Sequence, residues 1–223
     1  MHDAGSAEAL RAAQPSAPRW LIGAGIAIAV ATALGAAFAP YLLVHHPYWL
    51  LALNPWPRHQ LLVAPDAAIL PFVAVVVVRG MLSCAVSFEI GRVYGTRGVA
   101  LIEGHSSESG SVLRYVERLF GRFSYAFLLF TPGWFTSALA GMSGVARVRC
   151  LTLNSVGLLG WALIHYRVGA WLEPWTAPIL RFIQEHMLSA TVICVVLVLV
   201  YQGHVWRQRS LRKQLDAVKR RGN

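Results

Sequence analysis

Residues 123–144 read FSYAFLLFTPGWFTSALAGMSG, a stretch apolar enough to enter a bilayer but interrupted by Pro132 and Gly133. Pro132 lacks the N–H that a helix interior needs, and Gly133 tolerates backbone angles that other residues avoid. Each arm beside the break would be roughly 13 Å long as a helix, about half of a ~30 Å hydrocarbon core. Two half-length arms predict a re-entrant hairpin, and such breaks often mark binding sites in transporters. A single kinked helix that spans the membrane is the alternative, and this stretch alone leaves both open.

Composition points to a membrane protein. The chain has 223 residues, of which 56% are hydrophobic and 13% charged, and its mean hydropathy is +0.52. These values are typical of a multi-pass membrane protein rather than a soluble domain. The net charge of +10 does not indicate a nucleic-acid partner, because the basic residues cluster at the ends of apolar runs, as the positive-inside rule expects. Cys84, Cys150 and Cys194 show no CxxC or Cys/His spacing, so neither a disulfide framework, a metal site nor a cofactor is expected.

Four apolar runs are long enough to be transmembrane helices. They lie at residues 20–44, 67–90, 150–168 and 179–201. Residues 1–19 are expected to be a disordered tail rich in Ala, Pro and Ser, and cleavage of the first run as a signal peptide after Ala39 is the less favoured alternative. The last span, with its aromatic interfacial lead-in, occupies 171–205, and residues 206–223 form a basic tail.

A second irregular stretch, residues 47–66, resembles the first in layout. Short apolar arms flank Asn54-Pro55-Trp56-Pro57, which has the composition of a turn. The chain is therefore expected to hold two opposed half-helix hairpins in an inverted repeat, although the identity between the two stretches is too weak to prove a repeat. The residues expected to set the backbone geometry of the hairpins are Pro55, Pro57, Pro132, Gly133 and Gly141.

Charge sets the expected orientation in the membrane. A polar loop is predicted at 96–110, followed by an amphipathic helix whose Arg114, Arg118 and Arg122 would lie either on anionic headgroups or in solvent. Basic residues in this region and in the tail predict that both termini are cytoplasmic in an inner or plasma membrane. The hairpin near Pro55 would then enter from outside and the one near Pro132 from inside.

Short motifs run through the middle of the chain in a fixed order: Ile90-Gly91-Arg92-x-x-Gly95, Phe130-Thr131-Pro132-Gly133, Ala140-Gly141, and then Asn154, Gly157 and Trp161. Together, over roughly residues 45–170, they resemble the DedA family, also called the SNARE-associated or VTT domain family. The resemblance implies an all-α membrane protein with two opposed re-entrant hairpins that moves lipid headgroups or serves envelope homeostasis linked to the proton gradient. The chain would be a divergent member, because Leu129 and Phe135 stand where the family commonly has arginines. Arg58-His59-Gln60 stands where the family often has a glutamate.

Basic residues are the candidates for binding substrate. Arg79 lies in the middle of the second span, where a charge costs at least ~2.5 kcal/mol and is expected to face a cavity or a partner. The alternative is a span that ends at Val78 and leaves Arg79 at the surface. Arg147 and Arg149 follow the second hairpin, where they would either bind lipid phosphate or anchor the helix end.

Three titratable residues are candidates for proton or ion coupling. Asp66 is either a functional carboxylate or the cap of the following helix. Glu89 either forms an ion pair with Arg92 or Arg147 or takes part in transport. His59 either titrates in the first hairpin or is an ordinary interfacial histidine.

Enzyme motifs such as HExxH, G-x-S-x-G and the P-loop are absent from the sequence, so an enzyme is not predicted. The leading hypothesis is a transporter for a phosphate-bearing lipid headgroup or a small anion, with membrane lipids as its partners and Arg79 as its phosphate ligand. The second hypothesis is a non-transporting membrane scaffold that keeps the fold but has lost the charged site. A homo-oligomer is compatible with both.

Overall fold

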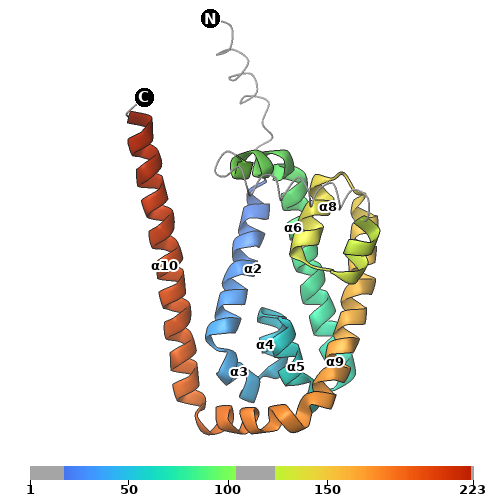
Figure 1. Ribbon diagram of the computed structural model, residues 1–223. Helices are drawn as coiled ribbons and strands as arrows, with labels where there is room; N and C mark the ends of the chain where they lie inside the picture. Colours follow the sequence, from blue (N-terminus) through green and yellow to red (C-terminus); the bar gives the residue numbers. More distant parts are fainter. Residues whose placement is uncertain (1–17, 104–123, 222–223) are drawn as a thin grey trace, which may run out of the picture. The chain divides into compact units, whose positions relative to one another are not determined.

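The computed structural model describes residues 18–103 and 124–221, and the regular structure in those residues is helical (Figure 1). The helices are α2 (Arg19–Ala37), α3 (Ala39–His45), α4 (Pro47–Leu53), α5 (Pro57–Val63), the 3-10 helix η1 (Ala64–Asp66), α6 (Ile69–Glu103), a helix at 124–130, α8 (Trp134–Met142), α9 (Arg147–Glu185) and α10 (Met187–Arg221). This architecture confirms the all-α prediction. The amphipathic helix predicted near 111–122 and most of the amino-terminal tail lie outside the described residues.

Four helical segments of the described chain are long and apolar enough to cross a membrane. They are Arg19–Ala37, Ile69–Gly95, Arg147–Glu185 and Met187–His204. Many of their large apolar side chains are exposed, among them Leu70, Val192 and Leu199. Exposed apolar surface on this scale is expected where lipid, rather than water, surrounds the helices. The chain therefore has the features of a multi-pass membrane protein.

Three helix boundaries differ from the sequence-based expectation. The first run breaks at Phe38 into α2 and α3, and Pro40 lies in the first turn of α3, where its missing N–H is harmless. The loop predicted from Thr96 is also wrong for residues 96–103, because α6 continues to Glu103. Extending an existing helix costs less free energy than nucleating a new one.

The aromatic lead-in expected at the start of the last span, from residue 171, belongs instead to α9. Helix α9 continues through Pro174 and Pro178 to Glu185, so α10 and the last span begin only at Met187. The two prolines are four residues apart, and the hydrogen bonds they omit therefore lie on one side of the helix. Such a helix bends rather than ends, and α9 changes direction in its carboxyl-terminal half (Figure 1).

Two compact units make up the chain, and each contains one pair of short helices. One unit comprises 1–28 and 80–161, and the other 29–79 and 162–223. The second unit has a core of Leu50, Leu51, Val63, Ala64, Ala67, Phe72, Val76 and Ala162. The first unit has a smaller core of Phe88, Leu128, Leu139, Ala140 and Cys150.

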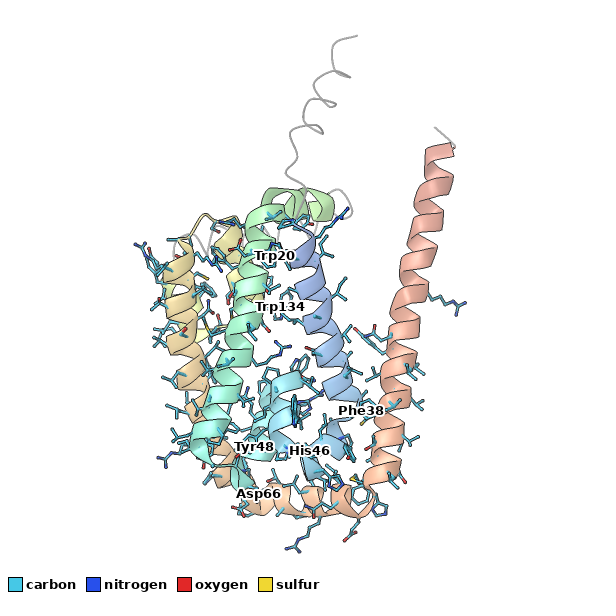
Figure 2. The ribbon with its side chains drawn as sticks, turned by 180° about the vertical axis from the view of Figure 1, so that it is seen from behind. Trp20, Phe38, His46, Tyr48, Asp66 and Trp134 are labelled. Atoms are coloured by element: carbon cyan, nitrogen blue, oxygen red, sulfur yellow. The ribbon has the colours of Figure 1, made fainter. Side chains whose placement is uncertain are left out.

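In the second unit, α4 and α5 lie along the beginning of α6. At the open end of the pair, the backbone N–H of Ala68 donates to the Tyr48 hydroxyl at 3.0 Å, and Figure 2 labels Tyr48 and Asp66 at this end. At the turn, the carbonyl of Leu53 accepts a hydrogen bond from Arg79 at 3.4 Å. The eleven residues from Ala68 to Arg79 correspond to roughly 16 Å of helix. The turn of the pair is therefore about that far along α6 from its open end.

In the first unit, helix 124–130 and α8 fold back on each other, since Leu128 and Leu139 belong to one core cluster. Glycines permit backbone-to-backbone contact here. A Cβ added at Gly141 would overlap the carbonyl oxygen of Phe88 in α6, and one added at Gly157 of α9 would overlap that of Leu129. Several motif residues of the sequence thus gather where α8 and the turn before it pack against α6 and α9.

Candidate functional site

Arg79 is a charged residue well inside a long apolar helix. It lies in α6 and is only 8% exposed. Its Nη2 donates to Thr32 Oγ1 at 3.2 Å and to the Leu53 carbonyl at 3.4 Å. Leu53 ends α4, where carbonyls lose their intrahelical partners. The alternative that Arg79 lies at the surface beyond the end of the span is therefore wrong.

Asn54 and His59 complete the inner side of the α4–α5 turn. Asn54 is 1% exposed, and its Nδ2 donates to the Thr32 carbonyl at 3.4 Å. His59 Nδ1 lies 2.9 Å from the Asn54 carbonyl, which can only accept, so Nδ1 carries the proton and Nε2 is the nitrogen that titrates. The Oδ1 atom of Asn54 is buried and has no hydrogen-bond partner within residues 18–103 and 124–221. A buried acceptor without a partner is costly and is a feature of binding sites.

Gln60 joins this turn to α9. Its Nε2 donates to the Pro55 carbonyl at 2.6 Å, which leaves Oε1 to accept from His165 Nδ1 at 2.8 Å. His165 lies within α9, so this bond joins α5 to α9. The six residues Thr32, Asn54, His59, Gln60, Arg79 and His165 are called the turn cluster below.

Most other members of the turn cluster could not be identified from sequence. Thr32, Asn54, Gln60 and His165 carry no motif, and Thr32 is 47 residues from Arg79 in the chain. The available signal is their polarity: each is a hydrogen-bonding side chain in or beside an apolar segment.

Glu89 forms the charged cluster of the first unit. It is 5% exposed; its Oε2 lies 2.7 Å from Arg92 Nη2, and its Oε1 lies 3.5 Å from Arg147 Nε. The longer contact is an ion pair without hydrogen-bond geometry, since Oε1 has no hydrogen-bond partner among the described residues. Glu89 thus contacts both arginines that the sequence offered as alternatives. Arg149 is exposed and bonds to the Tyr125 hydroxyl.

Asp66 does not cap the following helix. It is exposed at the end of η1, and the next helix begins at Ile69, so the predicted cap of a helix at Ala67 is wrong.

Asn154 is fully buried in α9, where its Nδ2 donates to the Cys150 carbonyl at 2.9 Å and to Ser137 Oγ of α8 at 3.3 Å. Asn154 therefore ties α8 to α9.

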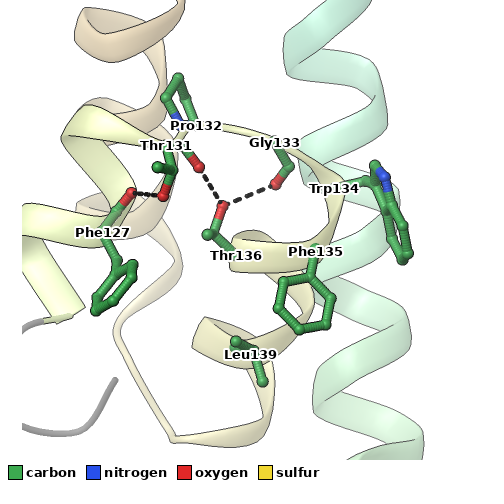
Figure 3. A pocket seen from close by; sticks show the side chains of 8 residues that line it. All are labelled: Phe127, Thr131, Pro132, Gly133, Trp134, Phe135, Thr136 and Leu139. Carbon is green, nitrogen blue, oxygen red and sulfur yellow. Dashed lines mark hydrogen bonds between the residues drawn. The ribbon is translucent and has the colours of Figure 1, made fainter. Parts of the chain in front are cut away.

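A pocket with a volume of 370 Å³ lies at the Pro132 break (Figure 3). It is lined by Phe127, Thr131, Pro132, Gly133, Trp134, Phe135, Thr136 and Leu139. Thr136 Oγ1 donates to the carbonyls of Thr131 at 2.9 Å and Gly133 at 3.2 Å, and Thr131 Oγ1 donates to that of Phe127 at 2.8 Å. The hydroxyl groups therefore bond to carbonyls at the break, of which those of Phe127 and Gly133 also accept from the backbone N–H groups of Thr131 and Ser137. The pocket wall is largely apolar.

Gly133 does not have the backbone angles expected of it. Its φ of 166° and ψ of −179° are extended values that any residue adopts. An added Cβ would also meet nothing within 4 Å, so neither the backbone angles nor a lack of space requires glycine at this position.

Within the part of the chain that the structure describes, no group of three or more His, Cys, Asp or Glu side chains could hold a metal ion. Comparison of the chain with models of protein families, with curated proteins and with solved structures gave no match.

Proposed function

We propose that this chain is a divergent DedA-type protein of the inner or plasma membrane that translocates a phosphate-bearing lipid headgroup or a small anion. The observation that carries the proposal is the turn cluster, in which the buried cation Arg79 and the unpartnered amide oxygen of Asn54 both lie beside Thr32. A guanidinium binds phosphate oxygens, and an amide oxygen accepts from a phosphate or headgroup hydroxyl. Arg79 and Asn54 together therefore fit a headgroup that carries both a phosphate and a hydroxyl group.

The geometry of the two short helix pairs supports re-entrant hairpins. The α4–α5 turn contacts Arg79, roughly 16 Å along α6, and the turn at 131–133 packs against Gly157, roughly 15 Å along α9 from Arg147. Both depths are about half of a ~30 Å hydrocarbon core. In the proposed inverted repeat, the first pair enters from outside and the second from the cytoplasm, with both chain termini cytoplasmic.

Transport through this site requires an exchange of partners. Arg79 would release the Leu53 carbonyl or Thr32 and take phosphate oxygens in their place, so binding is coupled to movement of the α4–α5 turn. Arg147 and Arg149, both exposed at the start of α9, would gather anionic headgroups at the cytoplasmic surface. His59, which lies in the turn cluster, is the group proposed to couple transport to protons; Glu89 is paired with Arg92 and Arg147 and is assigned a structural role.

The experiment is translocation of a fluorescent anionic phospholipid in vesicles that contain the purified protein. Arg79→Leu should lower the rate about 10–100-fold, which corresponds to losing one charge-assisted hydrogen bond, while Arg79→Lys should keep part of the activity. Arg167→Leu is the matched control, since it removes an exposed arginine of α9. Asn54→Ala should lower the rate with Arg79 intact. Normal translocation by Arg79→Leu would exclude this site.

A scaffold without transport is the second candidate. It is favoured by the bonds of Arg79 to Thr32 and Leu53, which tie α2 and α4 to α6 and suffice to explain a buried arginine structurally. A scaffold predicts that wild-type vesicles translocate no faster than empty ones. Arg79→Leu would then lower only the unfolding temperature.

A further inference from the structure

The pocket at the Pro132 break is not part of the turn cluster and has its own chemistry. It lies at the turn between helix 124–130 and α8, where Trp161 Nε1 donates to the Phe130 carbonyl at 2.7 Å. Exposed aromatic side chains surround it: Phe130 and Trp134 are each 67% exposed, and Phe135 is 46% exposed. Trp161 lies roughly 20 Å along α9 from its first residue. In the membrane placement proposed above, the medium at that distance from the helix end is hydrocarbon.

The pocket offers little to an ion or a headgroup. The carbonyls of Phe127, Thr131 and Gly133 accept hydrogen bonds from Thr131, Thr136 and Ser137. Most of the remaining lining is the apolar surface of aromatic rings, Leu139 and Pro132. An empty apolar cavity forfeits dispersion contacts along its wall, so a flexible hydrocarbon chain is the occupant that fits.

A cation lies nearer the end of the same helices. The Arg149 guanidinium sits over the Tyr125 ring, 5.5 Å from its centroid, and bonds to the Tyr125 hydroxyl. Tyr125 is the second described residue of the helix that leads to the pocket, and Arg149 is in the first turn of α9. From Arg149 to Gly157, which contacts the Pro132 ring, is eight residues or roughly 12 Å. An acyl chain extending from a phosphate at Arg149 spans that distance.

We propose that the pocket holds one acyl chain of a resident anionic phospholipid whose phosphate lies on Arg149. The lipid fills the gap left by the helix break and stays bound; it is not the transported molecule. This inference rests on the membrane placement of residues 123–144 that is part of the proposed function, but not on transport at Arg79. The occupant is a lipid of the surrounding bilayer. Its acyl chain contacts the apolar pocket wall, and its anionic headgroup contacts Arg149.

Gly133 allows the pocket to be filled without strain. Its extended backbone accepts any side chain, and the added Cβ meets no atom within 4 Å, so Gly133→Leu places its side chain in open space beside the pocket wall. Gly160→Leu is the matched control, because Gly160 also has nothing within 4 Å but does not line the pocket.

The test is photolabelling of the full chain in vesicles of phosphatidylcholine that contain phosphatidylglycerol with a photoreactive group in its acyl chain. Labelled residues are located by mass spectrometry. In wild type, labelling should concentrate on residues 127–139. Gly133→Leu should reduce it about fivefold, equivalent to about 1 kcal/mol, while Gly160→Leu leaves it unchanged. Arg149→Gln should reduce labelling by phosphatidylglycerol to a similar extent, about 1 kcal/mol per basic residue, but not labelling by a photoreactive phosphatidylcholine.

Arg79→Leu separates this inference from the proposed function, because it should lower the translocation rate about 10–100-fold and leave the labelling intact. Labelling spread evenly over the exposed faces, or equal in Gly133→Leu and Gly160→Leu, would overturn the pocket assignment. Unchanged phosphatidylglycerol labelling in Arg149→Gln would refute the placement of the phosphate.

Discussion

Replacing Gly141 with alanine tests the packing that holds α8 against α6. An added Cβ would overlap the Phe88 carbonyl oxygen and lie 2.8 Å from the backbone nitrogen of Arg92, against the ~3.5 Å at which heavy atoms normally pack. Both neighbours are backbone atoms, so no side chain can move aside and the helices must separate. Overpacking of this kind costs about 1–3 kcal/mol.

The expected net effect of Gly141→Ala is a loss of about 2 kcal/mol, or about 4–8 °C in apparent Tm for a chain of this size. Gly160→Ala in α9 is the control, because its added Cβ is unopposed and alanine favours helix by about 1 kcal/mol. Both proteins would be purified in detergent and heated, and the monodisperse fraction measured by size-exclusion chromatography. The packing described here is wrong if Gly141→Ala melts at or above the temperature of Gly160→Ala.

Two further predictions concern the membrane topology. Reporter fusions that end at Asn223 should be active in the cytoplasm and those that end at Ala177 outside it, because basic residues dominate the tail. An external signal at Asn223 contradicts the orientation. Single cysteines at Ser124 and Ser143, in a chain without its native cysteines, should both react with an impermeant maleimide from the cytoplasmic side. Reaction from opposite sides would identify a spanning helix in place of a re-entrant pair.

Helix breaks were the features most predictable from sequence. Pro132 and the Asn54–Pro57 segment interrupt helices through local chemistry, because a proline removes a backbone donor wherever the rest of the chain lies. The burial of Arg79 was also predictable, because its position within a long apolar run is itself a sequence fact.

Features that depend on distant contacts were not predictable. Arg79 bonds to Thr32 and Leu53, and no local pattern selects those two residues from other polar groups and carbonyls. Helix α9 continues through Pro174 and Pro178, whose missing hydrogen bonds lie on one side of the helix and bend it. The helix propensity of a single proline does not predict this. Helix propensity gives the free-energy cost of placing each residue in a helix, whereas tertiary packing determines whether the folded chain places it there.

The contacts of Glu89 lead to a prediction that separates a structural carboxylate from a coupling one. Glu89 is nearly buried, but the side chains of Arg92 and Arg147 are 62% and 59% exposed, so solvent screens both ion pairs. A double-mutant cycle of Glu89→Gln and Arg147→Gln should therefore give a coupling energy of only about 0.5–1 kcal/mol, measured from thermal unfolding. Because each carboxylate oxygen faces a cation, we expect a structural role, in which Glu89→Gln translocates lipid at the wild-type rate per folded molecule. If Glu89→Gln instead stops translocation while it melts like wild type, and Arg147→Gln remains active, the carboxylate exchanges protons during transport and the structural assignment is wrong.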